Sequence, residues 1–174
     1  KIFKQIDEQV NKASKDLAEE RGACPDAAEY GYQERFSNKT AIAPTASISI
    51  ICGGASPGVE PVAANSYTHK TLSGSFNVRN RYLVELLEKH GKNTDDVWSG
   101  ITTNQGSVSH LDFLTDIEKD VFKTAFELDQ KWIIELSGDR TPFISQAQSI
   151  NLFVPADIHK RELHKIHFDA WKKG

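Results

Sequence analysis

The sequence predicts an α/β fold in which helices and short strands alternate along one domain-sized chain. The N-terminal segment places apolar residues at intervals of three and four, the spacing of an amphipathic helix. Two later stretches, at residues 40–43 and 149–154, favour extended backbone instead. With 174 residues, 39% hydrophobic and 26% charged, the chain is long enough to bury one core.

The charge and apolar patterns argue against several classes of function. The net charge is −3 and basic residues are interleaved with acidic ones, so the sequence predicts no polynucleotide partner. No apolar run approaches the roughly 20 residues of a membrane span, and the N-terminus lacks a signal-peptide core. We therefore expect a cytoplasmic protein without a membrane partner. Cys24 and Cys52 are expected as free thiols, with Cys52 a small buried hydrophobic residue.

The first helix is expected to run from Lys1 to Gly22, which is suited to end it. Its apolar face is formed by Ile2, Phe3, Ile6, Val10, Ala13 and Leu17. The segment 23–39 is polar and contains Pro25 and Gly31, so it is expected as a surface loop.

A strand, a turn and a helix are expected next. Thr40 to Ala43 would form a short buried strand, and Pro44 would open the helix, because its fixed φ suits the first helical position. An alternative is a buried strand over Ser47 to Ile51, in which isoleucines alternate with serines. The helical alternative makes this turn a candidate phosphate site, because a helix N-terminus carries unpaired N–H donors and a partial positive charge. Thr45 to Ser47 would present free amides, and Thr45 and Ser47 would add hydroxyls.

The middle of the chain begins with a turn that contains Pro57, Gly58 and Pro61 and orients Glu60. A carboxylate would repel a phosphate, so we interpret Glu60 as hydrogen-bonded to backbone donors. One strand is expected within Tyr67 to Val78.

Two helices follow, and both have clear start signals. Asn80 is expected to cap a helix that runs to about His90, with leucines on its buried face. Thr94 would begin a second, shorter helix with Val97, Trp98 and Ile101 inward, and Gly106 would end this section.

The C-terminal third is expected to contain one long helix. Thr115 and Glu118 fit a capping box, and apolar residues continue at helical spacing to Gly138, with the aromatic side chains in the core. An extended stretch over Thr141 to Ile144 and a strand over Ser149 to Val154 would follow. Asp157 would cap the last helix, on one face of which lie Leu163, Ile166, Ala170 and Trp171.

Other kinds of site are weakly supported by the sequence. Among the six histidines, His164 and His167 lie one turn apart, but no carboxylate or cysteine completes a ligand spacing, so no metal site is predicted. The sequence contains no Gly-x-Ser-x-Gly elbow, no P-loop and no dinucleotide-binding fingerprint. Catalytic residues are therefore not predicted in this chain.

A resemblance is carried by several motifs in order. Ala43-Pro44-Thr45-Ala46-Ser47 is followed by Gly58-Val59-Glu60-Pro61 and Asn65-Ser66-Tyr67-Thr68. Thr71 to Phe76, Gln146 to Leu152 and His167 to Gly174 follow in turn. In this order and rough spacing, the chain resembles the C-terminal region of the ribonucleotide reductase large subunit, from about Arg35 to Gly174. The pattern is most similar to class I, and class II, which uses adenosylcobalamin, stays open as an alternative.

The resemblance implies that residues 1–174 form the C-terminal part of a ten-stranded α/β barrel. The family reduces ribonucleoside diphosphates, or in some members triphosphates, with a cysteine radical on a finger loop and two reducing cysteines. Those cysteines lie upstream of this region, so neither role passes to Cys24 or Cys52. The turn that matches Pro44, Thr45, Ala46, Ser47 and Ile48 holds the substrate phosphates in the family. We expect these five residues to bind the phosphates of a ribonucleoside diphosphate, which would position the ribose for reaction.

The resemblance also implies partners and limits. The segment itself would bind no cofactor; the complete enzyme would need a radical generator, in class I a metal-containing small subunit, and a thiol reductant. The ATP-sensing region, the effector site, the finger loop and the thiol pair are absent, as is the paired-tyrosine segment after Gly174. The chain is thus expected to be inactive alone and to need the N-terminal part of the large subunit. It would be a truncated gene product, a split subunit or a cut piece, and a homo-oligomer is possible. Two alternatives stay open: a stand-alone nucleotide-binding module, and a non-catalytic piece that completes another chain's barrel.

Overall fold

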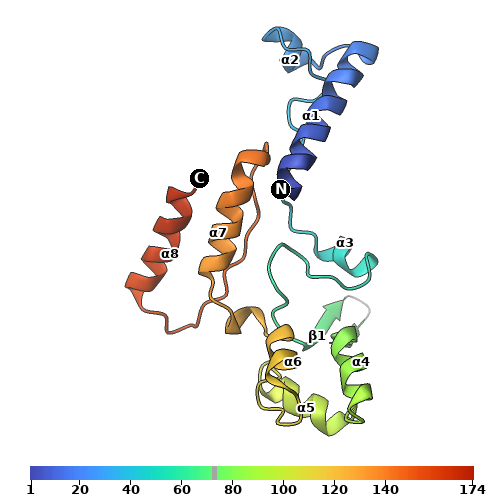
Figure 1. Ribbon diagram of the computed structural model, residues 1–174, viewed down its shortest axis with the longest axis vertical. Coiled ribbons are helices and arrows are strands. Elements are labelled where there is room, and N and C mark those ends of the chain that lie inside the picture. The colour runs from blue at the N-terminus through green and yellow to red at the C-terminus, as the bar shows by residue number, and fades with distance from the viewer. Residues whose placement is uncertain (72–73) are drawn as a thin grey trace. The chain divides into compact units, whose positions relative to one another are not determined.

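The computed structural model describes residues 1–71 and 74–174 (Figure 1). Leu72 and Ser73, which belong to the Thr71–Phe76 match and to the predicted strand over Tyr67–Val78, lie outside the described residues. The chain divides into two compact units. The first unit consists of Lys1–Val59, Lys131–Leu152 and Asp157–Gly174, and the second of Glu60–Gln130 and Phe153–Ala156.

The first unit begins with helix α1 (Ile2–Arg21), which ends at Gly22 as predicted. Gly22 has φ of 82°, a conformation that favours glycine. The segment 23–39, predicted as a loop, contains the five-residue helix α2 (Pro25–Glu29). Pro25 stands at its first turn, where a missing N–H costs nothing, and Asp26 lies near the positive end of the helix dipole.

Helix α3 (Ala46–Ile51) follows, so the alternative of a strand over these residues is wrong. The buried strand predicted for Thr40–Ala43 is also wrong, because the segment forms only a single parallel bridge between Ile42 and Gln148. Ile42 is half-buried, and Ala41 and Ala43 are exposed. The strand predicted over Ser149–Val154 is also wrong, because none of these residues is in a strand or a bridge. The bridge partner of Ile42, Gln148, lies just before them, and one bridge is too short a contact for a ladder.

The remaining named elements of the first unit are helices and one 3₁₀ turn. Helix α7 (Lys131–Arg140) is followed by the 3₁₀ turn η2 (Thr141–Phe143) and by α8 (Lys160–Lys172), which packs beside α7 (Figure 1). Gly138 permits this close approach, because a Cβ there would lie 2.9 Å from the Cβ of Lys173. The Lys173 Nζ lies 2.6 Å from a carboxylate oxygen of Glu135, an ion pair between α7 and the end of α8.

Three predictions for the C-terminal segment need correction. Residues 141–143 form a 3₁₀ turn and not an extended stretch, since Pro142 has the φ that suits a first helical turn. His159, not Asp157, caps α8, its ring nitrogen accepting a hydrogen bond from the Arg161 amide. The apolar face predicted for α8 is only partly covered, because Trp171 is 73% exposed.

The second unit contains an antiparallel hairpin of β1 (Ser66–Thr71) and β2 (Gly74–Arg79), paired from Ser66 with Arg79 to Thr71 with Gly74. The single strand predicted within Tyr67–Val78 is therefore two strands. Gly74 has φ of 139°, a conformation that favours glycine and accompanies the reversal of the chain.

Helices α4 (Arg81–Lys89) and α5 (Asp95–Thr103) confirm the predicted caps. The side chain of Asn80 accepts from the Tyr82 amide, and that of Thr94 accepts from the Val97 amide. Their apolar faces join the segment after α5 in the main core of this unit, which consists of Leu83, Leu87, Trp98, Ile101, Val108, Leu111 and Leu114.

The long helix predicted from Thr115 to Gly138 is wrong. The capping box at Thr115 and Glu118 is present, but the helix that it starts, α6 (Asp116–Val121), has only six residues. A second capping box, Thr124 with Glu127, starts the 3₁₀ turn η1 (Ala125–Glu127), and α7 begins only at Lys131. The aromatic side chains expected in the core are largely outside it, with Phe126 56% and Trp132 66% exposed.

Candidate functional site

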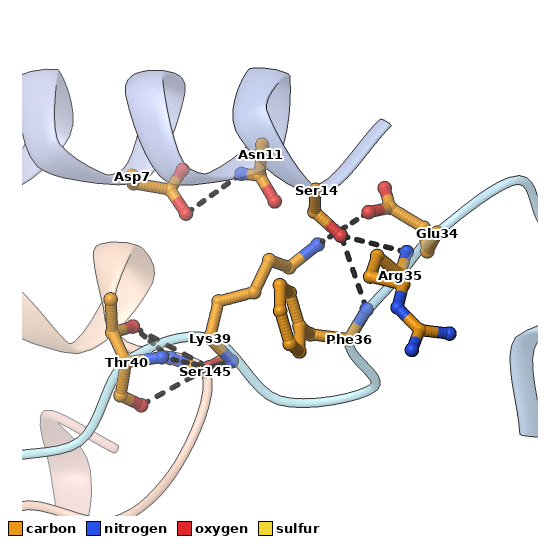
Figure 2. A network of polar contacts seen from close by, with 9 residues as sticks. All are labelled: Asp7, Asn11, Ser14, Glu34, Arg35, Phe36, Lys39, Thr40 and Ser145. Carbon is orange, nitrogen blue, oxygen red and sulfur yellow. Dashed lines mark hydrogen bonds and ion pairs between the residues drawn. The ribbon is translucent and has the colours of Figure 1, made fainter. Parts of the chain in front are cut away.

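The predicted phosphate site lies in the first unit, on the segment between residues 40 and 59. Its upstream end is fixed by Ser145 (Figure 2). The Ser145 hydroxyl accepts from the amides of Lys39 and Thr40, both at 2.9 Å, and donates to the Thr40 carbonyl at 3.1 Å. The Ser145 amide donates to the Thr40 hydroxyl at 3.0 Å. These bonds hold the chain four residues before Pro44 in one place.

Further contacts extend this anchoring in both directions. The Ser149 amide donates to the Ile42 carbonyl at 2.7 Å, so residues 145–149 run along the segment that leads to α3. On the upstream side, the buried Ser14 of α1 accepts from the amides of Arg35 and Phe36 (Figure 2). Hydrogen bonds from Ser14 and Lys39 lower the pKa of Glu34, which therefore stays charged beside the Lys39 ammonium.

Helix α3 begins at Ala46, so Pro44 lies two residues before it and does not open it. The Ser49 amide donates to the Thr45 carbonyl at 2.7 Å and closes the first turn. Ser49 is buried, and its hydroxyl donates back to the Ala46 carbonyl at 2.7 Å. Gly53 and Gly54, with φ of 89° and 75°, follow the end of the helix.

The amides of Ala46, Ser47 and Ile48 have no acceptor among residues 1–71 and 74–174. All three residues are exposed, and they form the first turn of α3, where N–H groups have no partner inside the helix. The expectation of a free amide at Thr45 is wrong, because this amide donates to the Pro57 carbonyl at 2.9 Å. The Thr45 hydroxyl donates to the same carbonyl at 3.0 Å.

The remaining candidate residues lie as follows. Cys52 is exposed, which corrects the expectation of a buried position; it follows the last turn of α3, where Ile51 is 83% exposed. Cys24 is half-buried and also a free thiol. Glu60 is buried at 5% exposure, and it belongs to the second unit.

Neither a metal centre nor a membrane span is found in the described part of the chain. Across the described residues, no three histidine, cysteine, aspartate or glutamate side chains come together as a group that could hold a metal ion. None of the helices in the described part of the chain is long and apolar enough to cross a membrane.

Sequence reasoning missed the residues that hold the site in place. Ser145 and Pro57 contact the loop from positions 105 and 12 residues away in sequence. The signal was present, because both Gly58–Pro61 and Gln146–Leu152 are among the matched motifs and each adjoins one of these anchors.

Comparison with protein families gives a match to the barrel domain of ribonucleotide reductase over residues 3–174. The chain belongs to the ribonucleotide reductase family. It is 48% identical over 177 aligned residues to the ribonucleoside-diphosphate reductase large subunit of Invertebrate iridescent virus 6. The alignment covers 99% of this chain and 18% of that protein. With the large subunit of Invertebrate iridescent virus 3, the identity is 44% and the coverage 100% and 28%.

A solved structure agrees with these matches. The class Id ribonucleotide reductase alpha subunit of Actinobacillus ureae is 38% identical and superposes with a TM-score of 0.85. It covers 99% of this chain, which in turn covers 31% of the alpha subunit. The predicted resemblance and the prediction of a partial α/β barrel are thereby confirmed. The chain spans less than a third of each of these three ribonucleotide reductase relatives.

Proposed function

We propose that this chain is part of a ribonucleoside-diphosphate reductase large subunit and supplies the loop that holds the substrate phosphates. The observation that carries the proposal is the open turn at the start of α3, within a family match that covers almost the whole chain. Three neighbouring amides without an acceptor among the described residues, on small or exposed residues, are suited to bind the oxygens of a phosphate. The roles proposed for Ala46, Ser47 and Ile48 rest on these amides, and Pro44 and Thr45 belong to the same proposed loop as the residues that lead into them.

The chemistry of these residues is binding and orientation. The amides of Ala46, Ser47 and Ile48 would donate to phosphate oxygens, and the Ser47 hydroxyl would add one donor. Free energy gained at the phosphates would hold the ribose in a fixed position, which lowers the entropic part of the barrier to reaction. We assign no radical or redox step to the residues of this chain.

We propose class I for the complete enzyme, because the similar solved structure is a class Id alpha subunit. The radical would then come from a metal-containing small subunit, and electrons from a thiol reductant. The rest of the large subunit would supply the catalytic cysteines. The isolated chain is therefore expected to bind substrate phosphates but to reduce nothing.

Binding of a ribonucleoside diphosphate to the purified chain, measured by calorimetry, tests the phosphate loop. Replacing Ser47 with Ala should weaken binding about 3- to 10-fold, since a tenfold loss corresponds to about 1.4 kcal/mol and one neutral hydrogen bond contributes about that or less. Ala46→Leu should abolish binding, because a bulky side chain keeps the phosphate from the amides. Ser37→Ala, an exposed serine of the same unit, is the matched control and should have no effect.

A second candidate function is a non-catalytic piece that completes the barrel of another chain. It is favoured by large apolar side chains left open, among them Ile2 at 73% and Trp132 at 66% exposure. This alternative predicts no diphosphate binding by the chain alone and predicts self-association. Sedimentation of the calorimetry samples separates the two: binding by a monomer supports the phosphate loop, and aggregation without binding supports the alternative.

A further inference from the structure

The carbonyl oxygen of Pro57 accepts both hydrogen-bond donors of Thr45. The Thr45 amide lies 2.9 Å from this oxygen, and the Thr45 hydroxyl lies 3.0 Å from it. Thr45 also accepts from the Ser49 amide at 2.7 Å through its own carbonyl. The residue therefore joins the turn at 56–58 directly to the first turn of α3.

Pro57 itself is unsuited to bind a phosphate. It has no amide hydrogen, and a carbonyl oxygen offers an anion no donor. Its ring fixes φ, so the direction of its carbonyl is set before any ligand arrives. The Pro57 carbonyl contacts the loop at Thr45, so we expect an effect of Pro57 on phosphate binding to be transmitted through this residue.

We propose that Pro57 and Thr45 act together as a positioning pair for the phosphate loop. This inference rests on the proposed function of that loop. The two hydrogen bonds fix the residue directly before Ala46 and leave the next three amides as the ones that face a ligand. Ser145 holds the upstream end of the same segment, because its hydroxyl accepts from the amides of Lys39 and Thr40. The loop is thus held at both ends before substrate binds, which reduces the entropy lost on binding.

Two substitutions disturb the pair from opposite sides. Pro57→Ala keeps the carbonyl but frees φ, so the acceptor is no longer held in one direction. Thr45→Val removes the hydroxyl and keeps the amide and the shape, and Thr45→Ser restores the hydroxyl. The matched control is Pro25→Ala, which changes another exposed proline of the same unit.

The experiment measures two quantities by NMR on the purified chain. Hydrogen exchange of the residue-45 amide reports on the pair without any ligand. Titration with inorganic pyrophosphate, followed through the amide signals of residues 46–48, reports on binding. We expect Pro57→Ala to accelerate exchange at residue 45 and to weaken pyrophosphate binding about tenfold, with the thermal midpoint unchanged. Thr45→Val should weaken binding similarly, Thr45→Ser should restore it, and the double variant should lose less than the sum of the single losses.

Each outcome decides between the hypotheses. If wild type binds pyrophosphate and both Pro57→Ala and Thr45→Val bind equally well, the positioning role is wrong and the phosphate loop stands. Additive losses in the double variant would also overturn the pair, because they indicate independent roles. If pyrophosphate leaves the signals of residues 46–48 of the wild type unchanged, the proposed function fails, and the positioning role fails with it.

Discussion

Asn65 joins four segments of the second unit through a fully buried side chain with 1% exposure. Its amide nitrogen donates to the carbonyls of Gly106 and Phe122 at 3.0 and 2.7 Å. Its oxygen accepts from the Asn80 side chain at 2.9 Å, so the residue that caps α4 is tied to the same point. A buried amide with every group paired is stabilising, whereas the loss of one partner leaves the others unpaired.

Replacing Asn65 with Ala should therefore lower the free energy of unfolding by about 2–3 kcal/mol, because the Phe122 carbonyl loses its donor and the Asn80 side-chain amide loses its acceptor. The Gly106 carbonyl keeps the backbone amide of residue 65 as a donor. Urea-induced unfolding measures this. Asn104→Ala is the matched control, since Asn104 also donates to a backbone carbonyl, that of Gly100, but is exposed. Its cost should be below about 1 kcal/mol. Equal losses of unfolding free energy in the two variants would show that the burial of Asn65 does not add to its contribution to stability.

Gly106, which packs against residues 64 and 65, is a position where only glycine fits. It has φ of 83°, and a Cβ there would lie 2.4 Å from the Cβ of Ala64 and 2.9 Å from the Asn65 nitrogen. The sequence correctly indicated that Gly106 ends the section after α5, but not the close approach of residues 64–65. Such a contact depends on tertiary packing, and a one-dimensional pattern does not contain it.

At the scale of elements, capping residues correctly predicted where α4 and α5 begin. The caps of α4 and α5 were predicted because Asn80 and Thr94 bond to amides two and three residues away. The helix over Thr115–Gly138 was wrong because periodicity alone cannot show where a run is interrupted. Thr124 has 2% exposure, and its capping box with Glu127 begins a new turn inside the apolar pattern. A Thr-x-x-Glu spacing was visible there and was the signal to use.

The structure of the proposed phosphate loop was predictable in part. A helix after the turn at Pro44 was one of two alternatives, and it is present, but it begins at Ala46 and not at Pro44. The role of the loop in phosphate binding stays a prediction. The acceptor of the Thr45 amide was not predictable, because Pro57 comes 12 residues later and only the folded turn brings it near. The exposure of Cys52 was missed for a similar reason: an apolar run is buried only if other segments cover it, and Ile51 beside it is 83% exposed.

The ion pair between His90, at the end of α4, and Glu118 of α6 is expected to make the stability of the second unit sensitive to acid. His90 follows α4, and its Nε2 lies 3.0 Å from a carboxylate oxygen of Glu118. Hydrogen bonds from His90 and from the Thr115 amide and hydroxyl lower the pKa of Glu118 from 4.5 to about 2. A carboxyl whose pKa is lower in the folded state stabilises it above the unfolded pKa. This stabilisation is lost as the pH falls from about 4.5 toward 2.

Glu118→Gln removes this titration and keeps the capping box, because Gln also fits it. We expect the urea midpoint of wild type to fall between pH 5 and pH 2.5, and the fall to be smaller in the Gln variant. Glu85→Gln, which removes an exposed carboxylate of α4, should behave like wild type. The same acid dependence in all three proteins would contradict the role of Glu118.

At the scale of the whole molecule, many large apolar side chains are exposed and are not covered by the core of their own unit. Large side chains stay open on several elements: Ile2 on α1, Ile51 on α3, Val121 on α6 and Trp171 on α8. The chain also spans less than a third of the three relatives compared with it above. Both facts fit a segment whose surface packs against further protein, and open apolar surface favours association in its absence.

Self-association of the purified chain is therefore expected to increase with its concentration and to respond to single surface changes. Val121 is 71% exposed at the last position of α6, where a positive charge also suits the helix dipole. Val121→Lys should raise the monomer fraction in sedimentation velocity without lowering stability. Ser99→Lys adds the same charge at an exposed polar position of α5 and removes no apolar surface. An equal shift in both variants would mean that charge repulsion, and not the apolar side chain, controls association; a monomeric wild type at all concentrations would contradict the expectation altogether.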